Sequence, residues 1–172
     1  ELEPTGLVVM GAGSIPLATA ADLRAFLAAA TTEAPGALAN HRYSADIIAI
    51  ARAAEALRDL PPDLASDNAL PRWLAEMAGV PVHDLRARRR LAMDVDSPLD
   101  LLLLEGWRDA PVLPLPDDAE AGLVRDRLAV LHRLAADPGA ELLVAGRTSA
   151  ADLRWLERST RSRTRALVEE RG

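Results

Sequence analysis

Two carboxylates stand two residues apart in the segment LAMDVDSPLD, at Asp94 and Asp96. The apolar residues before them predict a β-strand over residues 91–95, and residues two apart on a strand share a face. Both side chains would then project together at the carboxyl end of a strand, where open α/β sheets bind ligands. Two carboxylates and the phosphate groups of a ligand together provide the oxygen atoms that Mg²⁺ prefers. The spacing therefore predicts a magnesium site formed by Asp94 and Asp96.

The same segment has a structural alternative. Residues 97–100, Ser-Pro-Leu-Asp, match a helix N-terminus that carries a capping box and a proline in its first turn. In this alternative Asp96 also serves the helix cap, and Asp94 forms an ion pair with Arg88 or Arg90. Both interpretations of the two aspartates remain open at the level of the sequence.

A glycine turn near the start of the chain is the second segment with chemical potential. The apolar run at residues 7–10 ends at Gly11, Ala12, Gly13 and Ser14. Glycines let a backbone approach a ligand closely, and the N-terminus of the following helix attracts anions. We therefore predict that Gly11, Gly13 and Ser14 contact a phosphate. The alternative is an ordinary tight turn, because Pro16 stands where a dinucleotide-binding fingerprint needs its third glycine.

A polar segment, Asn40-His41-Arg42-Tyr43-Ser44, supplies further candidates. Asn40, His41 and Arg42 are predicted to line a ligand crevice, in which Arg42 or Arg90 would bind a phosphate through its guanidinium group. The alternative is a solvated loop whose last residues cap a helix.

The glycine-turn and aspartate motifs, GAGSIPLATAADL and DVDSPLDL, together resemble the MobA-like and CofC-like nucleotidyltransferases, which have the nucleotide-diphospho-sugar transferase fold. The resemblance covers about Leu7 to Leu104 and implies a nucleotide, Mg²⁺, and Asp94 and Asp96 as metal ligands. Ser14 stands where the family would place a metal-binding aspartate. The family's first strand and its Gly-rich nucleotide loop would precede residue 1. The resemblance therefore implies a site that is degenerate or a chain that is N-terminally incomplete.

The composition of the chain argues against several classes of function. The formal net charge of −6 argues against a general nucleic-acid binder. Cysteine is absent, which excludes disulfides and thiolate chemistry and makes a reducing cytoplasm the simplest location. All basic residues are arginine, so neither a Schiff base nor a P-loop lysine is available. No apolar run is long enough to cross a membrane, and the first residues do not resemble a signal peptide. A cytoplasmic protein without membrane attachment is expected.

The elements that would position these residues alternate between strands and helices. This alternation predicts an α/β fold with a mainly parallel sheet and helices on both faces, as in a Rossmann-type three-layer sandwich. One of the expected helices covers residues 45–57, where Ile47, Ile50 and Ala54 follow helical spacing. Residues 1–116 would form the nucleotidyltransferase-like core, and residues 117–172 a helix–strand–helix extension packed on the same domain.

Two functions from different classes follow. The first is a nucleotidyltransferase-like domain that binds a nucleotide or a phosphorylated metabolite with Mg²⁺, with or without catalytic activity. The alternative is a non-catalytic interaction or assembly protein on the same scaffold, forming a homo-oligomer through its arginine-rich tail, residues 159–172.

Overall fold

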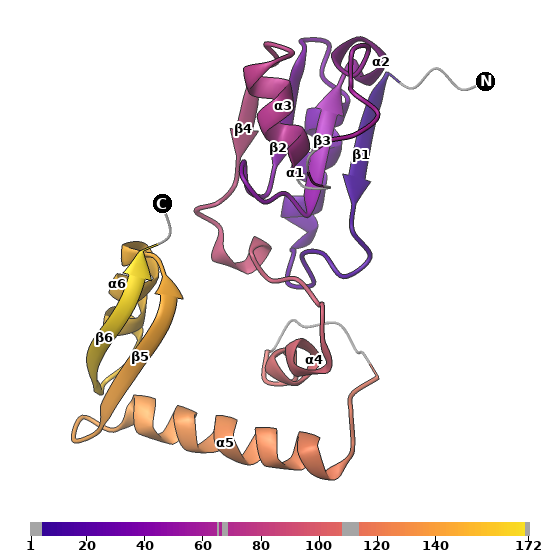
Figure 1. Ribbon diagram of the computed structural model, residues 1–172. Coiled ribbons are helices and arrows are strands. Elements are labelled where there is room, and N and C mark those ends of the chain that lie inside the picture. The colour runs from indigo at the N-terminus through magenta and orange to yellow at the C-terminus, as the bar shows by residue number, and fades with distance from the viewer. Residues whose placement is uncertain (1–4, 65, 67–68, 108–113, 171–172) are drawn as a thin grey trace. The chain divides into compact units, whose positions relative to one another are not determined.

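The computed structural model describes residues 5–64, 66, 69–107 and 114–170 (Figure 1). The chain divides into two compact units, Glu1–Leu115 and Pro116–Gly172. The first unit contains a four-stranded sheet, and the second contains a two-stranded sheet. The α/β class predicted from the sequence is therefore confirmed.

The sheet of the first unit has the strand order β1-β3-β2-β4. Its strands are β1 (Gly6–Met10), β2 (Gly36–Ala39), β3 (Ile47–Ala51) and β4 (Val82–Asp84). The central strand β3 pairs antiparallel with both β1 and β2, and only β2 and β4 pair in parallel. The described sheet is thus mixed, and the predicted mainly parallel pairing is wrong for these strands.

Strand β3 occupies most of the segment that the sequence predicted as a helix. All five of its residues are buried, so its apolar side chains need no alternation to satisfy the two faces of the sheet. A continuous buried run of this kind also matches helical spacing, although its three isoleucines favour a strand. The only helix in this range is the short α2 (Ala53–Ala56), which starts after Arg52.

Helices cover both faces of the β1–β4 sheet. Helix α1 (Ala20–Ala30) packs through Phe26 against the face that contains Ile47 and Ala49. Helix α2 and helix α3 (Leu70–Glu76) pack against the opposite face, where Leu74 is fully buried among residues such as Ile48 and Ile50. Because successive residues of β3 serve opposite faces, this one strand joins the two cores.

The segment with the two aspartates is not a strand. Residues Arg89–Leu91 form a 3₁₀ turn, and helix α4 (Pro98–Leu104) begins after Ser97. Between them Asp94 makes only an isolated bridge with Ser14, so the prediction that Asp94 and Asp96 project from one β-strand is wrong. The capping box formed by Ser97 and Asp100 is confirmed.

The second unit consists of α5 (Ala119–Ala136), β5 (Glu141–Thr148), α6 (Ala150–Ser159) and β6 (Arg163–Glu170). Strands β5 and β6 pair in parallel, with α6 as the crossover between them. The arginine-rich tail, whose composition also suits a helix, therefore contains a strand. Among the helices described, none combines the length and apolar character needed to cross a bilayer.

Candidate functional site

The glycine turn and the aspartate segment lie side by side, although about eighty positions separate them in the sequence. The backbone N–H of Val95 donates to the carbonyl of Gly13 at 3.0 Å, and the N–H of Ile15 donates to the carbonyl of Met93 at 3.1 Å. A side chain at position 13 would collide with the carbonyl oxygen of Val95 and lie 3.2 Å from Oδ1 of Asp94. Glycine at position 13 is therefore what allows the two segments to meet.

Ile15 has an unusual backbone conformation within this turn. Its φ of 45° lies in the left-handed region, which is sterically unfavourable for a β-branched residue and costs about 1–2 kcal/mol. The side chain is 4% exposed and packs in the cluster that includes Phe26 and Leu91, so burial offsets this cost. The core thus holds the turn in the conformation that brings Gly13 to Val95.

The carboxylate of Asp94 has three acidic neighbours at this end of the sheet. Burial raises the pKa of Asp94, and the negative charges of Asp46, Asp96 and Asp100 raise it further. The hydrogen bond from the N–H of Val95 to the Asp94 carboxylate only partly opposes this effect. A bound cation would relieve the repulsion between Asp94 and its acidic neighbours.

Asp94 and Asp46 each have one carboxylate oxygen that a cation could contact. Oδ1 of Asp94 accepts from the N–H of Val95, and Oδ2 of Asp46 accepts from Asn40, so each carboxylate keeps one oxygen without a hydrogen bond among the described residues. Within that same part of the chain, no group of three His, Cys, Asp or Glu residues has the geometry of a metal site. An ion bound at this end of the sheet would therefore take most of its ligands from phosphate oxygens and water.

Asp46 is a carboxylate that sequence reasoning did not select as a ligand. Its backbone carbonyl accepts from the N–H of Gly11 at 3.0 Å and from the hydroxyl of Ser14 at 2.9 Å. Its position follows from the pairing of β1 with β3, in which Met10 is opposite Ile47. The sequence analysis predicts a helix over residues 45–57, so it does not predict the pairing of β1 with β3 that places Asp46 here.

Asn40 has a structural role. The side chain is 2% exposed, and its amide nitrogen donates to Oδ2 of Asp46 at 2.8 Å and to the carbonyl of Leu91 at 2.9 Å. Its amide oxygen accepts from the N–H groups of Asp46 and Ile47. Both amide hydrogens are used, so Asn40 closes its own loop and ties it to the 3₁₀ turn instead of facing a ligand.

His41 and Arg42 are half-buried in the same loop. Nδ1 of His41 accepts from the N–H of Tyr43 at 3.1 Å, and the two rings meet edge to face. Nε of Arg42 is buried and has no hydrogen-bond partner among the described residues. Among the described residues, neither side chain forms a hydrogen bond or an ion pair with Asp94.

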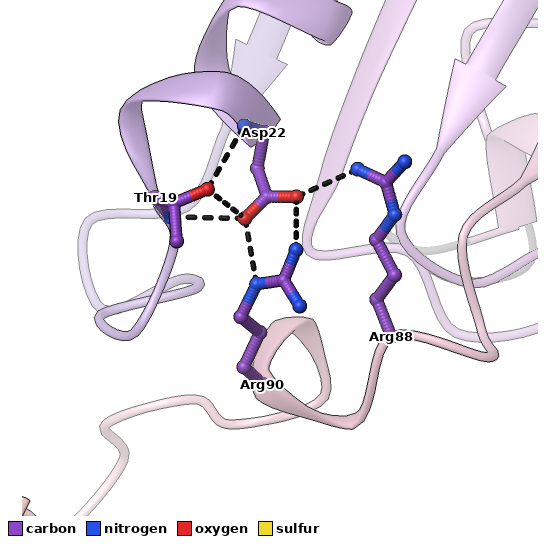
Figure 2. A network of polar contacts seen from close by, with 4 residues as sticks. All are labelled: Thr19, Asp22, Arg88 and Arg90. Atoms are coloured by element: carbon purple, nitrogen blue, oxygen red, sulfur yellow. Dashed lines mark hydrogen bonds and ion pairs between the residues drawn. The ribbon is translucent and has the colours of Figure 1, made fainter.

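Arg90 and Arg88 bind Asp22 of helix α1 (Figure 2). Asp22 is fully buried, and it also accepts hydrogen bonds from the backbone and hydroxyl of Thr19, which caps the helix. The Arg90 guanidinium holds the pKa of Asp22 far below its ordinary value, with smaller contributions from Thr19 and Arg88, while burial acts in the opposite direction. The alternative in which Asp94 pairs with one of these arginines is therefore wrong.

Comparison with known proteins adds no relative. No family model, curated protein or solved structure matches the chain. Within the first unit, the glycine turn, Asp46 and Asp94 lie together at one end of the sheet.

Proposed function

We propose that the first unit binds a nucleotide or another phosphorylated metabolite together with Mg²⁺. The observation that carries the proposal is the contact between Gly13 and Val95, which sets the Asp94 carboxylate beside a glycine turn. Such a turn offers backbone donors to a phosphate, and the carboxylate offers an oxygen to the cation that accompanies the phosphate.

The glycine turn has two backbone N–H groups that could bind a ligand. The N–H groups of Gly11, Ser14 and Ile15 are bonded to protein carbonyls, whereas those of Ala12 and Gly13 make no backbone hydrogen bond among the described residues. Successive free N–H groups in a turn form a concave donor site for anions. In our proposal the phosphate binds to these two amides.

The carboxylates would hold the cation. Asp94, with Asp96 or Asp46, would bind Mg²⁺, which when bound neutralises the charge of the ligand's phosphates. The hydroxyl of Ser14 donates to the carbonyl of Asp46 and so supports the loop. This assignment favours a degenerate form of the MobA-like and CofC-like nucleotidyltransferases that the two motifs resemble, in which binding is retained and transfer is weak or absent.

Calorimetry with CTP and GTP tests the proposal. We expect one of the nucleotides to bind in the presence of Mg²⁺ and to lose at least about tenfold in affinity when the metal is chelated. The double variant Asp94→Asn with Asp96→Asn should lose the metal-dependent binding, and the exposed control Asp63→Asn should keep it. Absence of binding to the unmodified chain, or equal binding by the double variant, would overturn the proposal.

A second candidate function, assembly into a homo-oligomer, is favoured by the second unit. Leu143 and Leu167 are 69% and 76% exposed. They share one face of the β5–β6 sheet because Leu167 is opposite Ala145, two residues beyond Leu143. Light scattering should show an oligomer that Leu143→Glu with Leu167→Glu dissociates. A monomeric unmodified chain would exclude this candidate.

A further inference from the structure

Two arginines of the first unit converge on one carboxylate. Nη1 of Arg88 lies 2.7 Å from Oδ1 of Asp22, and Nε and Nη2 of Arg90 lie 2.8 Å and 2.7 Å from its two oxygens (Figure 2). The arginines come from the segment around the 3₁₀ turn, and Asp22 comes from the first turn of α1. Thr19 binds the same carboxylate through its backbone N–H and its hydroxyl, which fixes the orientation of Asp22.

The charges of this network do not balance. One buried carboxylate faces two guanidinium groups, so the cluster carries one net positive charge on a chain whose net charge is −6. Within the described residues, neither Arg88 nor Arg90 pairs with another acidic side chain, and the nearby Asp84 pairs with Arg86. A single arginine would have been enough to neutralise Asp22.

The uncompensated charge is accessible, whereas the carboxylate is not. The side chains of Arg88 and Arg90 are 40% and 38% exposed, and that of Asp22 is 0% exposed. Each guanidinium has five N–H groups, of which Arg90 uses two and Arg88 one in the bonds to Asp22. The remaining N–H groups are available to a second oxyanion, and the buried carboxylate does not shield them.

We propose that Arg88 and Arg90, oriented by Asp22, form a fork that binds the phosphoryl group of a ligand. Guanidinium groups bind phosphate oxygens in bidentate geometry, and prior ordering of both side chains lowers the entropic cost of binding. Asp22 and Thr19 act as positioning residues. Binding at this fork requires no metal ion, so it is separate from the Mg²⁺ site proposed for Asp94.

Nuclear magnetic resonance of the full chain tests the fork without any substitution. The Nε–Hε signals of Arg88 and Arg90 are followed during titration with inorganic phosphate, at constant ionic strength and with a chelator present. We expect saturable shifts at these two arginines, while Arg72 and Arg86, which pair with Glu76 and Asp84, stay unchanged. Equal small shifts at all four arginines, or none, would overturn the proposal.

Charge-preserving variants separate fork geometry from simple attraction. Arg88→Lys with Arg90→Lys keeps the net charge but removes the bidentate donors, so the affinity for phosphate should fall about tenfold. The matched control, Arg72→Lys with Arg86→Lys, should bind as the unmodified chain does. Equal affinities of the two variants would contradict the fork, and if the first fails to fold, the titration of the unmodified chain decides.

Two further comparisons identify the ligand chemistry and keep the proposals distinct. Succinate at the same ionic strength should bind more weakly than phosphate, and equal binding would show that the arginines do not select a phosphoryl group, against the proposal. Phosphate binding should persist in the chelator, whereas the nucleotide binding proposed for Asp94 requires Mg²⁺. Loss of phosphate binding on chelation would overturn the fork without affecting the magnesium proposal.

Discussion

At the scale of single residues, Asp22 and Asp94 are carboxylates with opposite relations to their surroundings. Asp22 is surrounded by donors, which lower its pKa, whereas Asp94 has acidic neighbours and partial burial, which raise its pKa. The charged form is therefore stabilised by the fold at Asp22 and disfavoured by the fold at Asp94. Substitution of each aspartate by asparagine should change stability in opposite directions.

Asp22→Asn should lower the free energy of unfolding by about 3 kcal/mol near neutral pH, because it leaves two ordered arginines without their counter-charge. The pKa of Asp22 is lower in the folded chain, so its contribution is complete above the unfolded pKa and is lost as the pH falls through the folded value. Urea unfolding at several acidic pH values measures both effects. The loss relative to the unmodified chain should shrink in acid, and a loss independent of pH would contradict this account.

Asp94→Asn should raise the free energy of unfolding at neutral pH by about 0.5 kcal/mol, because it removes the cost of burying a charge and the repulsion from Asp46 and Asp96. The amide oxygen can still accept the hydrogen bond from Val95. Since the folded pKa of Asp94 is raised, its penalty exists above that pKa and disappears as the pH falls below the unfolded value. Thermal unfolding of the variant and the unmodified chain, compared at neutral and acidic pH, should show this convergence. Destabilisation by the substitution would mean that the carboxylate is required for folding.

At the scale of elements, helix starts could be predicted from the sequence, whereas the pairing of strands could not. The helix that starts after Thr19 and the one that starts after Ser97 follow from capping boxes, whose hydrogen bonds form within four residues. Strand β2 has the sequence GALA, which contains no β-branched residue, and it becomes a strand through its pairing with β3. The segment around Asp94 has strand-like residues but is held by Gly13 and Ile15, contacts that no local pattern contains.

The candidate site divides in the same way. The residue types at Gly13 and Asp94 indicated chemistry, and the structure brings the two together. The position of Asp46 depends on strand pairing, and the bond between Arg90 and Asp22 depends on how the 3₁₀ turn packs against helix α1. Neither can be predicted from the spacing of residues in the sequence. Asn40 was predicted to contact a ligand because it is polar. Its burial and its four side-chain hydrogen bonds show that it holds the loop in place.

Gly13→Ala tests whether the turn and the aspartate segment act as one element. The new methyl group would meet the carbonyl of Val95, so we expect a loss of about 1–3 kcal/mol in unfolding free energy and loss of Mg²⁺-dependent nucleotide binding. Gly36→Ala is the matched control, because a methyl group there makes only ordinary contact with Pro81 at 3.7 Å. Chemical unfolding and calorimetry provide the two measurements. Equal effects of the two substitutions would contradict the close approach at Gly13.

At the scale of the whole molecule, the two units differ in how well their strands are buried. Strand β3 has paired strands on both sides and helices on both faces, whereas the described β5–β6 sheet has two strands and exposed leucines. Local stability follows the number of buried apolar contacts around a backbone hydrogen bond. The units should therefore open with different free energies.

Hydrogen exchange measures this difference. We expect the amides of β3 and of the second half of α1 to exchange most slowly, and those of β5 and β6 to exchange markedly faster. Exchange followed by mass spectrometry on the full chain resolves the two units by their peptides. Equal protection of β3 and β6 would indicate that the second unit is covered in solution, as the assembly candidate requires.

The buried amide of Asn40 makes the first unit intolerant of a negative charge at this position. Hydrolysis of this side chain to a carboxylate would replace a donor 2.8 Å from Oδ2 of Asp46 with a second negative charge and would also remove the bond to the carbonyl of Leu91. A one-dalton change in mass at this position would therefore be enough to remove the bond between the loop and the 3₁₀ turn.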